Sequence, residues 1–204
     1  MEVNSSEADR LKWNARYRSG SHADVATPSG VLAQHIGQAQ GRYALDVASG
    51  AGRNALFMAQ HGYLVDALDI SEAGLAIGRR AAAAQTLPIR WHQADLQVIE
   101  TWPRPHYDLI VMTHFIAPVL LSRLPAALSP GGIIMVEQHL RWAQPVPGGL
   151  AGPSSARFRV EPGSVLAALL ESEPALEVCV HEEGLVFGSG AQPQALARVV
   201  VLKP

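Results

Sequence analysis

The sequence has one cysteine, nearly balanced charge and no long apolar run. The lone Cys179 excludes an internal disulfide and a cysteine zinc site, and its apolar surroundings predict an inert core thiol in a reducing compartment. No segment reaches the roughly 20 apolar residues of a membrane span, and the first residues form no basic leader. We therefore expect a cytoplasmic protein without a membrane partner.

Lysine and arginine together number 16, against 18 aspartates and glutamates. A protein that binds phosphate backbones usually carries a basic excess, so nucleic acid is not an expected partner. The eight histidines lack metal-ligand spacing, and neither a Gly-x-Ser-x-Gly elbow nor a Gly-Lys-Ser/Thr phosphate loop occurs. The sequence therefore predicts no metal site, and it disfavours metal-dependent hydrolysis, serine esterase chemistry and ATP hydrolysis.

What the chain does have is an alternation of apolar strands and helices, within 204 residues that are 48% hydrophobic. Residues 43–47 form an apolar strand that contains Asp46, and a turn of small residues follows it. A helix over 53–61 and a second strand over 63–70, which contains Asp69, complete the unit. A right-handed crossover makes the two strands parallel, and such sheets bind ligands beyond the carboxyl ends of their strands. Both acids are expected near that edge.

The same alternation continues to the end of the chain. It predicts helices over 72–84, 118–128 and 162–171, a turn at 130–132, and strands over 89–93, 107–113, 133–138, 175–181 and 196–202. No helix separates the last two strands, only a glycine-rich connection over 184–190, so they form an antiparallel hairpin. The expected fold is α/β: a Rossmann-like, doubly wound sheet of seven strands, mostly parallel, with an antiparallel C-terminal hairpin.

One domain accounts for a chain of this length. We expect an N-terminal helical cap over 1–40, a cofactor-binding core over 41–140, and a last part over 141–204 with a long loop, a helix and the closing hairpin. The loop, residues 143–155, is rich in proline and glycine. It follows the fifth strand, where a lid over a substrate would be inserted.

Two kinds of nucleotide ligand are compatible with the first unit. The turn with Gly50 and Gly52 also fits a dinucleotide fingerprint, with Asp69 at about the right distance for a ribose hydroxyl. Asp46 argues against that ligand, because a carboxylate that faces a pyrophosphate costs roughly 1 to 4 kcal/mol at about 4 Å. S-Adenosylmethionine offers an ammonium group, a sulfonium and a ribose diol, and it has no phosphate. An NAD(P)-dependent oxidoreductase is the alternative, although a closing hairpin is unusual in dinucleotide domains.

Residues 45–55, LDVASGAGRNA, followed by residues 65–71, VDALDIS, resemble the class I S-adenosylmethionine-dependent methyltransferases. Within that family the chain is most similar to the small bacterial branch of tellurite-resistance methyltransferases and relatives of thiopurine methyltransferase. The resemblance implies methyl transfer from S-adenosylmethionine to a small-molecule acceptor. Ala48 and Ser49 stand where the family usually has a glycine and a small neighbour, a mild change that leaves the turn plausible.

The resemblance also implies which residues meet the cofactor. In the family the glycine turn passes under the methionine part, the acid that ends the second strand binds the ribose hydroxyls, and an acid after the third strand lies by the adenine. An N-terminal helix folds over the methionine end. Structural roles stay open for several of these positions, among them a buried loop cap for Asp46 and a helix cap for Asp69. The residues expected at the cofactor are Arg16, Tyr17, Asp46, Ala48, Gly50, Gly52, Asn54, Asp69, Ile70, Asp95, Leu96 and Thr113.

Methyl transfer depends mainly on positioning, so a catalytic base is optional. If the acceptor must lose a proton, His114 and Glu137 are the candidates, with His139 nearby. A hydrogen bond to a loop carbonyl is the structural alternative for His114, and a strand-end salt bridge is the alternative for Glu137. An acceptor that arrives as an anion needs no base, and Arg141 or Arg157 could serve it. A catalytically silent module that binds S-adenosylmethionine is a third possibility.

Overall fold

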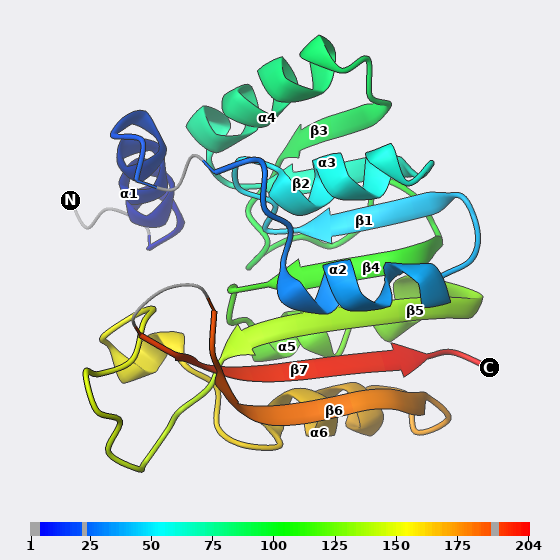
Figure 1. Cartoon of the computed structure of the whole chain (residues 1–204). Coiled ribbons are helices and arrows are strands. Elements are labelled where there is room, and N and C mark those ends of the chain that lie inside the picture. Colours follow the sequence, from blue (N-terminus) through cyan, green and yellow to red (C-terminus); the bar gives the residue numbers. More distant parts are fainter. Residues whose placement is uncertain (1–4, 22–23, 189–191) are drawn as a thin grey trace.

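The computed structural model describes residues 5–21, 24–188 and 192–204, which form one seven-stranded sheet with helices around it (Figure 1). The strand order is β3-β2-β1-β4-β5-β7-β6. The first five strands run parallel, and β7 is antiparallel to both β5 and β6. The predicted fold is therefore confirmed, including the closing hairpin. The strands are β1 (Tyr43–Val47), β2 (Leu64–Asp69), β3 (Ile89–Gln93), β4 (Tyr107–Thr113), β5 (Leu128–His139), β6 (Glu177–Val186) and β7 (Gln194–Leu202).

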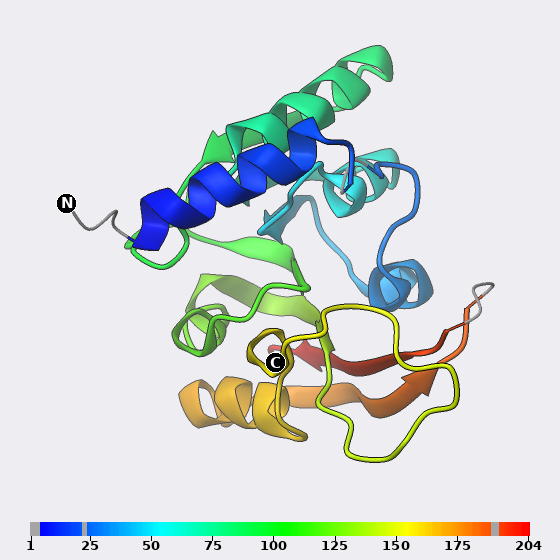
Figure 2. The ribbon, with the colours of Figure 1, turned by 90° about the vertical axis from the view of Figure 1, so that its left-hand side faces the viewer.

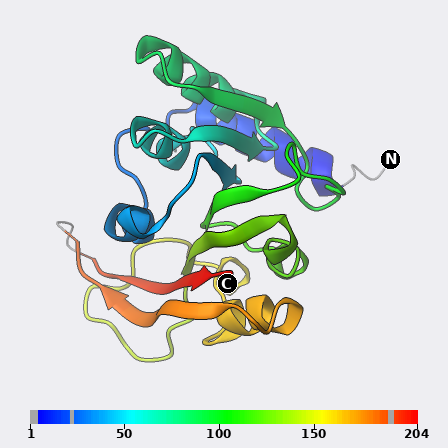
Figure 3. The same ribbon diagram turned by 90° about the vertical axis from the view of Figure 1, so that its right-hand side faces the viewer.

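Helices cover both faces of the twisted sheet, with α2, α3 and α4 on one side and α5 and α6 on the other (Figure 3). A separate buried cluster fills each interface: Leu32 and Met58 belong to one, Leu121 and Leu169 to the other. Strands buried on both faces read as nearly continuous apolar runs, which explains why β1 and β4 stand out in the sequence. The helices are α1 (Ser5–Arg18), α2 (Gly30–His35), α3 (Arg53–Gln60), α4 (Glu72–Ala84), α5 (Pro118–Leu121) and α6 (Ser164–Ser172), with short 3-10 helices at Ile36–Gln38, Pro125–Ala127 and Ala156–Phe158.

Helix α1 lies outside these layers, near the carboxyl ends of the parallel strands and alongside α4 (Figure 2). Asn14 attaches it there: the side-chain oxygen accepts hydrogen bonds from Ser71 Oγ (2.8 Å) and from the backbone N–H of Ala73 (3.0 Å). Ser71 in turn caps α4 by accepting the N–H of Gly74 at 3.1 Å. Of the N-terminal region expected as a cap, α1 packs beside α4 and α2 packs on the sheet.

Several predicted bounds match the structure. The helix predicted over 72–84 and the strands predicted over 89–93 and 107–113 coincide with α4, β3 and β4. The helix predicted over 118–128 is too long, because α5 ends at Leu121 and the following 3-10 helix begins at a proline, which has no N–H to continue an α-helix. The predicted turn at 130–132 falls inside β5, which begins at Leu128.

The last strands differ more from their prediction. β6 extends to Val186 instead of ending at residue 181, so Gly184 lies in a strand and not in a connection. Residues 189 and 190 of the predicted connection lie outside the described residues. Cys179 is exposed, so the expected core thiol is wrong. The reason is that β6 is the edge strand of the sheet, and a register irregularity in its pairing with β7 falls at this residue.

Among the described residues, no helix combines the length and hydropathy that crossing a membrane would require.

Candidate active site

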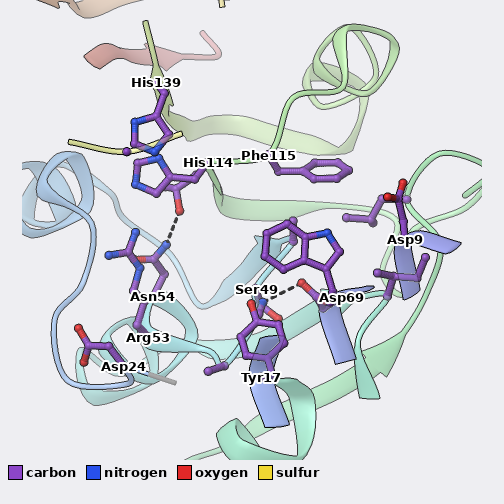
Figure 4. Close-up of a pocket in the computed structure, with 18 of the residues that line it drawn as sticks. Asp9, Tyr17, Asp24, Ser49, Arg53, Asn54, Asp69, His114, Phe115 and His139 are labelled. Atoms are coloured by element: carbon purple, nitrogen blue, oxygen red, sulfur yellow. Dashed lines mark hydrogen bonds between the residues drawn. The ribbon is translucent and has the colours of Figure 1, made fainter. Parts of the chain in front are cut away.

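A pocket of about 430 Å³ lies at the carboxyl ends of the parallel strands, next to α1 (Figure 4). β1 and β4 are neighbours in the sheet although two strands separate them in the chain, so the strand order reverses at this place. Open α/β sheets bind their ligands at such switch points. The lining residues are Asp9, Trp13, Tyr17, Asp24, Ala48, Ser49, Gly50, Ala51, Arg53, Asn54, Asp69, Ile70, Asp95, Leu96, Gln97, Thr113, His114, Phe115, His139, Gly152 and Gln194.

The structure brings together most of the residues predicted at the site. Four predicted residues do not line the pocket: Arg16, Asp46, Gly52 and Glu137. Those that line it are Tyr17, Ala48, Gly50, Asn54, Asp69, Ile70, Asp95, Leu96, Thr113 and His114.

The turn after β1 passes through three residues with positive φ, Ala48 (59°), Gly50 (58°) and Gly52 (84°). A residue with a Cβ is strained in this left-handed region by roughly 1 to 2 kcal/mol, whereas glycine is not. Ala48, which stands where the family usually has a glycine, is at such a position. At Gly52 the Trp91 ring fills the space that a Cβ would need, so this glycine allows close packing.

Asp46 is 1% exposed and does not line the pocket. Its Oδ2 accepts the backbone N–H of Ala55 at 2.9 Å, in the first turn of α3. Burial raises the pKa of Asp46 to about 7, against the lowering effects of that hydrogen bond and of the Arg53 charge. Asp46 thus holds α3 against β1, a structural role like the one considered for it, but with a helix and not a loop as its partner. Asp46 therefore does not face a ligand in the pocket, and the argument that its charge disfavours a pyrophosphate gains no support from the structure.

Asp69, at the end of β2, lines the pocket and is 8% exposed. Its Oδ2 accepts the N–H of Gly50 and its Oδ1 the N–H of Ser71, both at 2.8 Å. Burial raises the pKa of this carboxyl group, and the two hydrogen bonds oppose that shift. Because each carboxylate oxygen has a second acceptor site, Asp69 can hold the turn and still accept a hydroxyl group from the pocket.

Helix α1 contributes aromatic side chains to the pocket. Tyr17 packs over the turn, against Gly50 and Gly74, and Trp13 lines the same wall. Burial, and next the negative charge of Asp69, raises the pKa of the Tyr17 hydroxyl. Arg16 does not reach the pocket: its guanidinium carbon lies 4.8 Å from the centre of the Trp13 ring.

Asn54 connects three elements around the pocket. Its side-chain oxygen accepts the N–H of Ser29 (2.8 Å) at the start of α2, and its amide group donates to Thr113 Oγ1 (3.0 Å) at the end of β4 (Figure 4). The side-chain oxygen and nitrogen of Asn54 thus both form hydrogen bonds within the protein. Asn54 therefore fixes the wall of the pocket.

His114 and His139 stack at the ends of β4 and β5, with ring centres 4.4 Å apart and planes 18° from parallel (Figure 4). His114 has a φ of 55°, and its side chain is 29% exposed. Burial lowers the pKa of each imidazole from 6.5 to about 4, with a further lowering by Arg53 for His114 and by His114 for His139. Both rings are therefore neutral at pH 7. The buried Nδ1 of His139 has no hydrogen-bond partner within the described ranges.

Glu137 lies behind this pair and is 3% exposed. Its Oε2 accepts hydrogen bonds from Arg198 Nε (2.9 Å) and from the backbone N–H of Val31 (3.1 Å). Its Oε1 is 3.7 Å from His114 Nε2. Glu137 therefore forms the strand-end salt bridge considered as its structural alternative, and it can influence the pocket only through His114.

Arg159 organises the long loop after β5. Its guanidinium donates to the carbonyl oxygens of Leu140 (3.0 Å), Pro153 (3.0 Å) and Ala151 (3.4 Å). This holds Gly152 against the His139 ring, where a Cβ would collide with the imidazole. The loop expected as a lid thus forms part of the pocket wall in this structure.

Sequence reasoning did not select Asp24, Arg53, Phe115, Gly152 and Gln194, which also line the pocket. Arg53 follows the glycine turn directly, so its position alone could have identified it. No local pattern places Gly152 or Gln194 at the site, because the long loop and the hairpin reach it only through tertiary packing.

Comparisons with known proteins agree with this architecture. Residues 44–132 match a family model described as a methyltransferase domain. A ubiquinone biosynthesis O-methyltransferase from Coxiella burnetii is 26% identical over 98 residues, which are 46% of this chain and 42% of that protein. The chain thus spans less than half the length of this curated relative.

Two solved structures are similar over nearly the whole chain. TehB from Haemophilus influenzae has a TM-score of 0.68 and 19% identity, covering 93% of this chain and 66% of that one. Magnesium protoporphyrin IX methyltransferase (ChlM) from Synechocystis PCC 6803 with bound SAM has a TM-score of 0.66 and 14% identity, covering 98% of both chains. At these identities the likeness shows a common fold. Together with the methyltransferase-domain match over residues 44–132, it agrees with the predicted resemblance to the class I S-adenosylmethionine-dependent methyltransferases.

Proposed function

We propose that this protein transfers a methyl group from S-adenosylmethionine to a small-molecule acceptor and releases S-adenosylhomocysteine. The observation that carries the proposal is the pocket at the switch point of the sheet, where the glycine turn, the strand-end carboxylate and a histidine pair meet. Its volume of about 430 Å³ lies within the range of small-molecule sites, roughly 300 to 1,000 Å³. The bound cofactor would supply the activated methyl group on its sulfonium.

The residues of the pocket fit this cofactor. Asp69 has acceptor sites left for the ribose diol, and Gly50, which its carboxylate holds, lines the pocket beside it. Ile70 and Leu96 offer apolar contact for a purine, and Asp95 offers a carboxylate at its edge. These roles follow the family pattern carried over residue by residue.

The acceptor is assigned to the end of the pocket with His114, Phe115 and His139. Imidazoles that are neutral at pH 7 can accept a hydrogen bond from a hydroxyl or thiol, and orient it, without placing a positive charge beside a sulfonium. We assign this hydrogen-bond-accepting role to His114. Glu137 acts as a positioning residue, since its carboxylate faces His114 and not the pocket.

A ligand panel tests the cofactor assignment. Thermal unfolding is measured with S-adenosylmethionine, S-adenosylhomocysteine, NAD and NADP. The concentration of each ligand is about 100 times a dissociation constant in the micromolar range. Ligand at that excess stabilises a protein by roughly 2.7 kcal/mol, which moves the melting temperature by several degrees. We expect shifts with the two sulfur nucleosides. Shifts with the nicotinamides alone would assign the pocket to an oxidoreductase.

A second assay separates an enzyme from a silent binding module. S-Adenosylhomocysteine formation is followed with model phenols, thiols, amines and metalloid oxyanions as acceptors. An enzyme forms this product with at least one acceptor class, and His114→Gln lowers that rate while cofactor affinity is retained. Binding without product across the panel would indicate a module that only binds the cofactor.

A further inference from the structure

Arg53 is the only lysine or arginine among the described residues that line the pocket. The acidic side chains there are Asp9, Asp24, Asp69 and Asp95. The proposed cofactor has a carboxylate at its amino-acid end, in addition to its ammonium and sulfonium groups. A carboxylate that enters a pocket with several acids requires a positive partner, and Arg53 is the side chain able to provide it.

The guanidinium of Arg53 is not engaged elsewhere in a strong interaction. Within the described ranges it forms no salt bridge, and its hydrogen bond to the carbonyl oxygen of Thr27 is long, at 3.4 Å. Asp24, the acid beside it, already accepts the N–H of Ala26 at 2.8 Å. An arginine that is half-buried and weakly paired therefore keeps donors for a ligand.

The position of Arg53 suits the amino-acid end of the cofactor. It is the first residue of α3, directly after the glycine turn, and it lies on the same side of the pocket as Asn54 and His114 (Figure 4). Its charge lowers the pKa of His114, so the guanidinium acts electrostatically on the end where transfer would occur. Arg16, which the sequence indicated for the methionine end, does not line the pocket.

We propose that Arg53 binds the carboxylate of the methionine part of S-adenosylmethionine. This inference rests on the proposed function. It predicts that the protein discriminates against decarboxylated S-adenosylmethionine, which keeps the ammonium and sulfonium groups and lacks only the carboxylate.

Calorimetric titration of both ligands into the wild type and Arg53→Gln tests the proposal. The substitution should weaken binding of S-adenosylmethionine about 10- to 100-fold, the loss expected for charge-assisted hydrogen bonds, and should leave decarboxylated S-adenosylmethionine unchanged. Arg53→Lys should give an intermediate loss, because an ammonium keeps the charge without the planar fork of donors. Arg80→Gln, on the exposed face of α4, is the control for the change in net charge.

Each other outcome overturns the inference. Equal weakening of both ligands would mean that Arg53 merely supports the turn. Unchanged S-adenosylmethionine affinity in Arg53→Gln would mean that the guanidinium does not bind the cofactor carboxylate and contacts the acceptor instead. A wild type that binds neither ligand would fail already in the thermal panel, and would refute the proposed function together with this inference.

Discussion

Single side chains at this site combine structural and binding roles, and Asp69 is the clearest case. Its carboxylate ties the glycine turn to the end of β2 while it lines the pocket. Asp69→Asn keeps the shape and one acceptor oxygen but removes the charge. We expect about 10- to 100-fold weaker binding of S-adenosylhomocysteine, because charge-assisted bonds to the ribose diol are worth roughly 1.5 to 3 kcal/mol. Isothermal titration measures the loss.

The chain offers a matched control in Asp108, whose Oδ2 accepts the backbone N–H groups of Arg42 (2.7 Å) and Tyr43 (2.9 Å) outside the pocket. Asp108→Asn should lower the free energy of unfolding and leave ligand affinity unchanged. If Asp69→Asn binds like the wild type, the ribose is held elsewhere.

The histidine pair predicts a pH dependence of stability with a defined sign. Folding lowers the pKa of His114 and His139 from 6.5 to about 4, so between these values the unfolded chain holds protons that the folded chain does not. Their full contribution to stability is present above about pH 6.5 and is lost as the pH falls toward 4. Asp46 acts in the opposite direction, because its pKa is raised to about 7 on folding.

A comparison of variants isolates the histidines from Asp46. His114→Gln combined with His139→Gln should reduce the acid-induced loss of stability relative to the wild type. Urea unfolding at pH 7.5 and pH 5 measures the difference in both proteins. An identical loss in the two proteins would mean that the imidazoles titrate normally in the folded state.

At the scale of elements, the sequence predicts best where a strand is buried on both faces. β1 and β4, which are buried along nearly their whole length, have the predicted bounds, and the glycine turn and Asp69 are found because their signal is local. The direction of a side chain is harder to predict. Leu45 and Val47 face one buried cluster, so the alternation along β1 turns Asp46 to the opposite face, beneath α3. The apolar pattern around Asp46 did not show which helix would cover it.

The edge strand β6, and the pocket residues that come from the last third of the chain, were also harder to predict. β6 is covered on few of its positions, so its apolar pattern does not mark where it ends or that Cys179 is exposed. Gly152 and Gln194 reach the pocket through the long loop and the hairpin. Their places depend on tertiary contacts such as the Arg159 hydrogen bonds, which no local spacing encodes.

The attachment of α1 gives a prediction at this scale. Asn14 is buried and accepts two hydrogen bonds at the start of α4, so Asn14→Ala leaves Ser71 Oγ and the Ala73 N–H without this partner. Such a loss costs about 1 to 3 kcal/mol. We expect faster amide hydrogen exchange in α1 and weaker cofactor binding, because Tyr17 and Trp13 lose their fixed place over the turn.

Arg10→Ala, on the same helix, is the control, since the ion pair that Arg10 forms within the described part of the chain is an exposed one, with Glu7 at 3.6 Å. It should change neither exchange nor affinity, because such pairs contribute little. Unchanged exchange in Asn14→Ala would show that α1 is held by its aromatic contacts alone.

At the scale of the whole molecule, a buried ion pair joins distant parts of the chain. Arg198 of β7 faces Glu137 of β5 in the sheet register, and their Nε and Oε2 atoms are 2.9 Å apart. Glu137 also accepts the N–H of Val31 in α2, and Gly30 packs against the Arg198 guanidinium. The closing hairpin, the central sheet and the N-terminal segment therefore meet at one electrostatic contact.

This contact predicts a specific pattern of stabilities. Arg198→Met leaves the Glu137 carboxylate buried without its cation, which costs about 3 to 5 kcal/mol, whereas replacing both residues with apolar ones removes the unpaired charge. The double variant Glu137→Leu with Arg198→Met should therefore be more stable than Arg198→Met alone.

Urea unfolding of the wild type and the two variants, followed by far-UV circular dichroism and by tryptophan fluorescence, measures these stabilities. If the hairpin is part of one cooperative unit, the two signals coincide in each of them. A double variant less stable than Arg198→Met would mean that packing around the arginine stem, and not the charge pair, holds the hairpin to the core.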